Sequence, residues 1–130
     1  AEHKVRLFGE YDGYGPGEHT RDFIYVKDVV KVNFYFWDHP EISGIFNCGT
    51  GHAHQFNTLA KGVLKHFGSG ELEYVPFPEV LKGKYQSFTQ ADTANILAAG
   101  YDGGFTPIED AIAEYCELLD KTGGYYVYER

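Results

Sequence analysis

An arginine and an aspartate stand side by side at the end of a glycine-rich stretch, at positions 21 and 22. A guanidinium can donate two parallel hydrogen bonds to a phosphate or a carboxylate, so Arg21 is a candidate anion-binding residue. The alternative is a surface ion pair of Arg21 with Asp22 or Glu18. The chemistry of the residues alone favours neither interpretation.

A second candidate site is the polar loop that runs from Lys82 to Gln86. Lys82 and Lys84 supply two ammonium groups beside the hydroxyl of Tyr85. The loop could close over an anionic ligand, or it could be an ordinary solvated loop.

A Gly-Thr-Gly turn at 49–51 follows a strand-like segment and precedes a helical pattern, which is where a dinucleotide-binding fingerprint would lie. His54 occupies the place of the third glycine, and no acidic residue follows at the required distance. We therefore interpret 49–51 as a tight turn.

Thiol and imidazole groups gather around this turn, at Cys48, His52 and His54. These are ligand types that zinc prefers, but their spacing matches no common zinc site. We expect no metal here and solvent-facing histidines. Cys48 and Cys116 both lie in apolar runs, so we expect two buried free thiols.

The motifs that carry common catalytic chemistry are missing from the sequence. There is no Tyr-x-x-x-Lys pair, G-x-S-x-G elbow, Walker loop or H-E-x-x-H helix. Taken by itself, the chain has ligand-binding groups without a catalytic set.

Length and composition describe one globular domain of 130 residues, with 43% hydrophobic side chains. The net charge of −8, without any run of Lys or Arg, argues against nucleic acid and anionic membranes as partners. The first residues lack the long apolar segment of a signal peptide or a membrane helix, so we expect a cytoplasmic protein.

Strands and helices alternate along the chain, which predicts an α/β (α+β) fold without internal repeats or linkers. After the first strand, the glycine-rich residues 9–17 form a loop. The expected strands are 4–8, 21–26, 44–48 and 72–78, the last at an edge because it contains two prolines.

Four helices are expected. The first is capped by Asp28, carries Val30, Phe34 and Trp37 on its apolar face, and ends before Pro40. The second, 56–67, is closed by Gly68. A third is capped by Thr89 and runs from about 90 to 99, and a fourth is capped by Thr106 and runs to about Lys121.

Residues 21–29, Arg-Asp-Phe-Ile-Tyr-Val-Lys-Asp-Val, closely resemble a segment of the extended short-chain dehydrogenases that act on nucleotide sugars. Residues 44–51 resemble the strand and turn that follow it there. Both segments would fit many members, including UDP-galactose 4-epimerases and sugar-nucleotide dehydratases.

Three further segments, 73–78, 81–92 and 98–101, are similar to a narrower group, the ADP-L-glycero-D-manno-heptose 6-epimerases of lipopolysaccharide core synthesis. The resemblance implies an isomerase that interconverts the two ADP-heptose epimers. It also implies a bacterial source and an ADP-sugar substrate.

The resemblance covers only the carboxy-terminal, substrate-binding part of those enzymes. Residues 1–130 would then be the nucleotide-sugar-binding domain, and the amino-terminal Rossmann domain that binds NADP and supplies the catalytic Tyr and Lys would be absent. The fragment alone would be inactive, and the intact enzyme would be a homo-oligomer.

Carried over by motif, the resemblance implies six substrate-binding residues. Phe8, Gly9, Glu10 and Tyr11 match the loop after the Leu-Phe strand. Arg21 matches the arginine that meets the nucleotide phosphates, and Tyr85 matches the tyrosine of the L-[KR]-G-[KR]-Y loop. The chain would contain no catalytic, cofactor-binding or metal-binding residue.

Two other readings remain open: a domain of another nucleotide-sugar epimerase or dehydratase, and a stand-alone, non-catalytic binding module. An excised domain should expose a broad apolar face, whereas a stand-alone module should have a polar, well-covered surface. We also expect an excised domain to self-associate, swap elements or be marginally stable. The tail 125–130 is either an extra strand or a disordered end.

Overall fold

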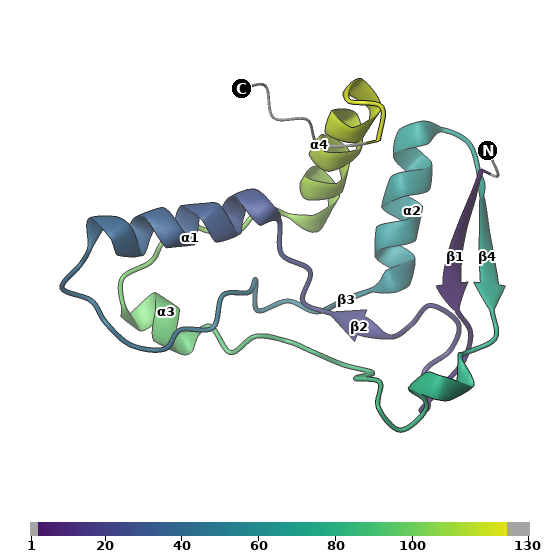
Figure 1. The fold of residues 1–130 in the computed structure, drawn as a ribbon, viewed down its shortest axis with the longest axis horizontal. Helices are drawn as coiled ribbons and strands as arrows, with labels where there is room; N and C mark the ends of the chain where they lie inside the picture. Colours follow the sequence, from purple (N-terminus) through teal and green to yellow (C-terminus); the bar gives the residue numbers. More distant parts are fainter. Residues whose placement is uncertain (1–2, 125–130) are drawn as a thin grey trace.

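The computed structural model describes residues 3–124, so the interpretation of the tail 125–130 lies outside the described residues. The structure contains two small sheets. Strand β1 (Lys4–Phe8) pairs in parallel with β4 (Glu71–Val75), in a register that joins Phe8 to Val75. Strand β2 (Thr20–Arg21) pairs antiparallel with β3 (His54–Gln55). The β1–β4 pair lies at one end of the molecule and the β2–β3 pair nearer its middle (Figure 1).

Helices α1 (Val26–Asp38), α2 (Phe56–Phe67), α3 (Ala94–Ala98) and α4 (Ile108–Lys121) and the 3₁₀ turn η1 (Glu79–Leu81) complete the architecture. Helix α2 lies between α4 and the β1–β4 pair, whereas α1 and α3 form the opposite end (Figure 1). Gly68 closes α2 in the left-handed region, as predicted. Within residues 3–124, every helix is too short or too polar to span a bilayer.

The core consists of two clusters of buried side chains. One lies between α1 and α3 and contains Val32, Ile96 and Tyr101. The other joins α2 to α4 and contains Ile108, Ile112 and Cys116. Cys116 is a buried free thiol, as expected.

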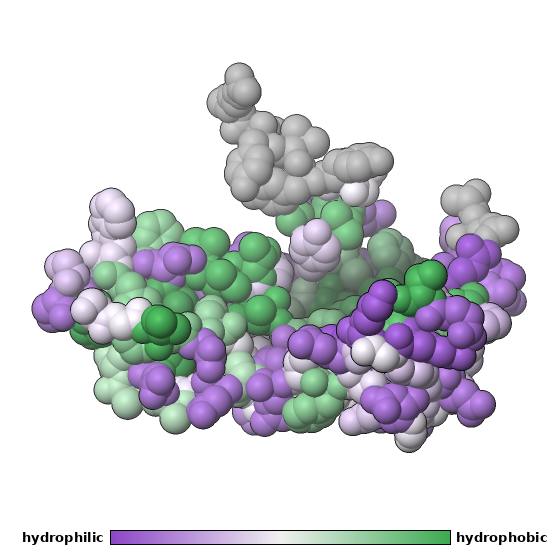
Figure 2. All heavy atoms as spheres, turned by 60° about the horizontal axis from the view of Figure 1, so that its bottom comes forward, coloured by the Kyte–Doolittle hydropathy of each residue, from purple (hydrophilic) through white to green (hydrophobic). Residues whose placement is uncertain are grey.

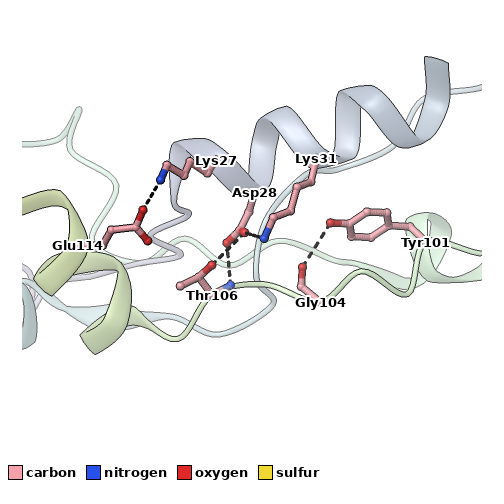
Figure 3. Close-up of polar contacts among 7 residues, drawn as sticks. All are labelled: Lys27, Asp28, Lys31, Tyr101, Gly104, Thr106 and Glu114. Carbon is pink, nitrogen blue, oxygen red and sulfur yellow. Dashed lines mark hydrogen bonds and ion pairs between the residues drawn. The ribbon is translucent and has the colours of Figure 1, made fainter. Parts of the chain in front are cut away.

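Asp28 links α1 to the residues that precede α4. It is not the helix cap that the sequence predicts. Helix α1 begins at Val26, so Asp28 lies inside its first turn. Its carboxylate is fully buried and accepts hydrogen bonds from the Thr106 amide (2.7 Å), the Thr106 hydroxyl (3.0 Å) and Lys31 Nζ (3.0 Å) (Figure 3). The predicted Thr106 cap is wrong for the same reason, because that hydroxyl bonds Asp28 instead of the amides of α4.

The three residues predicted on the apolar face of α1 do lie in this helix, but the described residues leave them exposed. Val32 and Asp28 face inward, whereas Val30, Phe34 and Trp37 are 46%, 63% and 81% exposed. The i, i+4, i+7 spacing marks an apolar face of the helix, but it does not say what covers that face.

Further predicted elements are wrong because the backbone of these segments does not form the expected strand or helix hydrogen bonds. The predicted strand 44–48 contains no strand and no strand partner among the described residues, and Cys48 is exposed rather than buried. The predicted Thr89 cap and helix 90–93 are absent, since the Thr89 amide donates to Thr20 O and the Ala91 amide donates to Asp22. A third prediction, the strand 21–26, is also wrong, because only Arg21 of this range lies in β2 and Val26 already begins α1.

Candidate functional site

Six aromatic rings meet at the carboxyl end of β1, where the loop 9–17 and the loop 82–86 converge. We call this group the aromatic cluster; its members are Phe8, Tyr11, Tyr14, His19, Phe77 and Tyr85. Tyr11 stacks on the buried Phe77 at 4.1 Å between ring centroids, and Tyr85 meets Phe77 edge-on at 5.2 Å. Such packing holds both loops against the end of the strand.

A pocket of about 230 Å³ opens beside the aromatic cluster. It is lined by Arg6, Leu7, Phe8, Gly17, His19, Phe56 and Tyr85. Its walls are mainly apolar and aromatic, with Arg6 and His19 as the charged or polar side chains. This is the usual arrangement of a small-molecule site.

Arg21 lies against two of the rings that line this pocket. Its guanidinium carbon is 4.8 Å from the Tyr85 ring centroid and 5.8 Å from that of Phe56. One guanidinium nitrogen donates to Thr20 O at 2.7 Å. No carboxylate within residues 3–124 forms an ion pair with Arg21, so the surface ion pair with Asp22 or Glu18 is not present. Four of its five N–H donors therefore stay available for an anion.

The Asp22 side chain binds residues of two other segments, around Thr50 and Ala91, and so fixes the backbone beside Arg21. Its carboxylate accepts hydrogen bonds from the Thr50 amide (2.9 Å) and hydroxyl (2.5 Å), the Gly51 amide (2.9 Å) and the Ala91 amide (3.0 Å). Burial alone raises the pKa of Asp22, but these hydrogen bonds together outweigh it and lower the pKa below its ordinary value.

The same bonds define the role of the turn at 49–51. Two of its amides donate to Asp22, so they hold a carboxylate of this chain rather than the phosphates of a dinucleotide. The described residues therefore do not fit a nicotinamide dinucleotide at this turn.

His19 is the central side chain of the aromatic cluster, and sequence reasoning missed it. It is 1% exposed, and its Nε2 lies 3.1 Å from the carbonyl oxygen of Tyr11. Its ring stacks on Tyr14 and meets Tyr85 edge-on. A lone histidine after a glycine-rich loop gives no sequence signal of burial. Phe56 and Phe77 were missed because their patterns indicated only a helix stripe and an edge strand.

The six predicted substrate-binding residues do not all meet at the pocket. Phe8 and Tyr85 line it, and Arg21 contacts Tyr85 and Phe56 of its lining without lining it itself. Tyr11 packs behind it and accepts a hydrogen bond from the Gly83 amide through its hydroxyl (2.5 Å), which ties the two loops together.

Gly9 and Glu10 lie outside the pocket. The Gly9 amide donates to Val75 O at 2.7 Å, so Gly9 extends the pairing of β1 with β4. Glu10 is exposed and faces a separate open hollow formed by residues 10–15. Their binding roles remain predictions.

Cys48, His52 and His54 are not brought together. The two histidines line a hollow near the start of α4, and Cys48 lines another beside α1. Among residues 3–124, no group of three His, Cys, Asp or Glu side chains is arranged to hold a metal ion.

Residues 2–49 match the model of a known family, the NAD dependent epimerase/dehydratase family. Among solved structures, the fold is similar to Helicobacter pylori ADP-L-glycero-D-manno-heptose-6-epimerase, with a TM-score of 0.71 and 27% identity. That match covers 90% of this chain and 33% of the other. The fold is that of part of an epimerase.

Other epimerases match equally well. UDP-glucose 4-epimerase of Thermotoga maritima, solved with UDP-glucose, has a TM-score of 0.71 and 27% identity, and the match covers 92% of this chain and 35% of the other. UDP-N-acetylglucosamine 4-epimerase of Methanobrevibacter ruminantium, solved with UDP-N-acetylmuramic acid, has a TM-score of 0.72 and 20% identity, with coverage of 92% and 35%.

These matches confirm the predicted fold class, a small mixed α/β structure shared with epimerases of the short-chain dehydrogenase type. The chain spans about a third of the length of each matched structure. Enzymes of ADP-sugars and of UDP-sugars match this chain alike. The similarity therefore supports a nucleotide-sugar epimerase or dehydratase fold, but it does not distinguish between substrates.

Proposed function

We propose that this chain is the nucleotide-sugar-binding part of an NAD(P)-dependent epimerase or dehydratase. The observation that carries the proposal is the Arg21 guanidinium, which has no carboxylate partner within residues 3–124 and lies against the rings of Tyr85 and Phe56, two residues that line the pocket. In a chain with a net charge of −8, a fixed cation is needed at the point where a diphosphate binds.

In this proposal, different residues contact different parts of the ligand. Arg21 forms the charged hydrogen bonds to the diphosphate. Phe8, Phe56 and Tyr85 provide apolar contact for the groups next to it. Lys84, next to Tyr85 in the sequence, would add positive charge, whereas Lys82 is already paired with Glu79 at 2.6 Å. The hydrogen bond from the Gly83 amide to the Tyr11 hydroxyl holds this loop in place.

The catalytic groups would belong to a part of the protein outside these 130 residues. That part would be a Rossmann domain with NADP and a catalytic Tyr and Lys, as the resemblance of the sequence implies. Two features support this division: the Gly49–Gly51 turn is occupied by Asp22, and the chain spans only about a third of the matched epimerases.

Our proposal for the substrate is an ADP-heptose, and for the activity a 6-epimerase. It is supported by the resemblance of residues 73–92 and by the 27% identity with the Helicobacter pylori enzyme. A UDP-sugar epimerase is the competing assignment, because the Thermotoga maritima enzyme matches with the same identity.

A stand-alone binding module is disfavoured by the surface. Such a module should cover its large apolar side chains, yet α1 leaves Phe34 and Trp37 largely exposed. This exposure indicates that further protein covers α1.

The test is an NMR titration of the ¹⁵N-labelled chain with ADP-glucose and UDP-glucose, with glucose as the control titrant. We expect shifts at Phe8, Gly17, Arg21 and Tyr85 with both nucleotide sugars and none with glucose, at dissociation constants on the order of 1 mM because half of the site is missing. Stronger binding of ADP-glucose would favour the ADP-heptose assignment. Shifts centred on His52 and His54 would contradict the site.

A further inference from the structure

His19 is a buried polar side chain in the wall of the pocket. It is 1% exposed, and it lines the pocket together with Phe8, Phe56 and Tyr85. The face shown in Figure 2 is mainly hydrophilic at the end of the molecule that carries β1 and β4. His19 instead lies inside this end, among aromatic rings. A polar group in such a place needs hydrogen-bond partners for both of its nitrogens.

Aromatic rings hold the imidazole of His19 on several sides. Its centroid lies 5.3 Å from that of Tyr14, which stacks on it, and 5.2 Å from that of Tyr85, which meets it edge-on. The centroid of the Phe77 ring lies at 5.7 Å. A ring enclosed in this way keeps one orientation, so the directions of its two nitrogens are set before a ligand arrives.

One nitrogen of His19 has a partner inside the chain. Nε2 lies 3.1 Å from the carbonyl oxygen of Tyr11. A carbonyl oxygen only accepts hydrogen bonds, so Nε2 carries the hydrogen and donates it. The neutral imidazole is therefore the Nε2–H tautomer, in which Nδ1 has a lone pair and can only accept.

The second nitrogen, Nδ1, has no hydrogen-bond partner within residues 3–124. A buried acceptor without a partner costs stability, whereas a phenylalanine at position 19 would fill the same aromatic surroundings without this cost. Because His19 lines the pocket, a ligand in the pocket can supply the missing donor.

We propose that His19 is a specificity-determining residue of the pocket, whose Nδ1 accepts a hydrogen bond from an N–H or O–H group of the bound nucleotide sugar. This inference rests on the proposed function and adds a requirement to it: the ligand must bring one hydrogen-bond donor between the aromatic walls. A ligand of the same shape without that donor leaves Nδ1 unpaired and binds more weakly. The donor belongs either to the nucleobase or to a sugar hydroxyl.

The tautomer is tested on the ligand-free chain. Long-range ¹H–¹⁵N spectra of the labelled chain, slightly above neutral pH, distinguish a protonated ring nitrogen from a bare one. The signals of His19 are identified among the six histidines by their absence in His19→Gln. We expect a protonated Nε2 and a bare Nδ1. A protonated Nδ1 would overturn the proposal, because the acceptor would not exist.

Titration of the same chain with ADP-glucose tests the contact itself. The ¹⁵N signal of His19 Nδ1 should move towards the position of a hydrogen-bonded acceptor, and glucose alone should leave it unchanged. Three further probes locate the donor: ADP lacks the hexose, 2′-deoxy-ADP also lacks one ribose hydroxyl, and purine riboside diphosphate lacks the amino group of adenine. The group that is missing from a probe that binds without moving Nδ1 is the donor.

The variant His19→Gln separates ligand binding from packing. Its amide nitrogen can still donate to the Tyr11 carbonyl, but it has no acceptor in the place of Nδ1. We expect the circular dichroism of the folded chain and an affinity for ADP-glucose that is weaker by about five- to tenfold. His66→Gln, the same change at an exposed site on α2, should leave the affinity unchanged. If His19→Gln does not fold, the Nδ1 signal of the wild type decides.

The failure of this inference can be told apart from the failure of the proposed function. If ADP-glucose shifts the amide signals of Arg21 and Tyr85 but not the Nδ1 signal of His19, or if a folded His19→Gln binds as tightly as the wild type, the role of His19 is overturned and the proposed function stands. If ADP-glucose shifts no signal at the pocket, the proposed function fails, and the role of His19 fails with it.

Discussion

Arg21 acquires its proposed role from its neighbours rather than from its side chain alone. Two aromatic faces hold the guanidinium, and Asp22, its nearest acidic neighbour in the sequence, bonds four donors on other segments. Sequence reasoning could name Arg21 as an anion-binding candidate, but it could not decide between a ligand and an ion pair. The hydrogen bonds of Asp22 decide against that ion pair.

Arg21→Ala should keep the fold and lose most of the nucleotide-sugar affinity. Removal of a charged hydrogen-bond donor costs about 1.5–3 kcal/mol of binding free energy, whereas the lost contact with Tyr85 costs only about 1 kcal/mol of stability. NMR titration with ADP-glucose and a thermal melt measure the two quantities. Lys65→Ala, at an exposed site on α2, is the control. A large drop in the melting temperature of Arg21→Ala would show that Arg21 is structural.

Asp22→Asn should destabilise the chain in a pH-dependent way. Folding lowers the pKa of Asp22 below its ordinary value of 3.8, so its stabilising contribution is complete well above that pH. The contribution is lost as the pH falls through the lowered pKa.

Urea unfolding of the wild type and Asp22→Asn between about pH 2.5 and 7 measures this effect. At pH 7 the variant should be less stable by about 2 kcal/mol, because its amide group opposes backbone N–H donors. The difference should shrink towards acid pH. A difference that is constant with pH would mean that the charge of Asp22 does not matter.

At the scale of elements, local sequence signals predicted α2, α4, β1 and β4 well. Their apolar periodicity and closing residues, such as Gly68, act within one turn or one strand. Predictions failed where a segment forms its hydrogen bonds with residues that are distant in the sequence. Asp28 and Thr106 each resemble a helix cap in sequence, yet they bond each other across 78 positions.

The candidate site was predictable only in part for the same reason. The matching motifs gave Phe8 and Tyr85, which line one pocket, and Arg21, which contacts the Tyr85 ring. His19, Phe56 and Phe77 come from a loop, a helix and a segment after a strand, and only the packed structure brings their rings together. The segment 44–48 has a strand-like pattern, but a strand needs a partner, which the described residues do not supply.

The buried junction of α1 and α4 should be sensitive to small changes. Asp28→Asn should lower the free energy of unfolding by about 3 kcal/mol, since a buried carboxylate with three donors loses its charge. Thr106→Val removes one of these donors. Combined in a double-mutant cycle by urea unfolding, the two changes should be non-additive. Asp120→Asn, on the exposed side of α4, is the control, and additive effects would contradict a direct coupling.

Gly17→Ala should disrupt the loop behind the pocket. Gly17 has φ +69°, and a Cβ there would collide with Asn57 Oδ1 and lie 2.9 Å from a Leu7 methyl carbon. We expect a loss of stability of more than about 2 kcal/mol, from both the backbone conformation and the collision. Gly13→Ala separates the effect of the backbone conformation from that of the collision, because Gly13 has φ +80° but open space around it. If both variants lowered the melting temperature equally, the collision would not contribute to the loss of stability.

At the scale of the whole molecule, the pocket lies at one end, beside β1, and the exposed side chains Val30, Phe34 and Trp37 of α1 lie at the other (Figure 1). The pocket is open and holds only part of what a nucleotide sugar needs, and α1 exposes side chains that folded proteins normally cover. Both features fit a chain that works within a larger assembly. They also agree with its coverage of about a third of the matched epimerases.

Native mass spectrometry of the gene product, captured from its source cell with an antibody to this domain, tests the proposed function most directly. We expect a polypeptide about three times heavier than 14.7 kDa that carries a bound nicotinamide dinucleotide. A species of 14.7 kDa without a dinucleotide would contradict a role in an epimerase or dehydratase and would make this chain a binding protein in its own right.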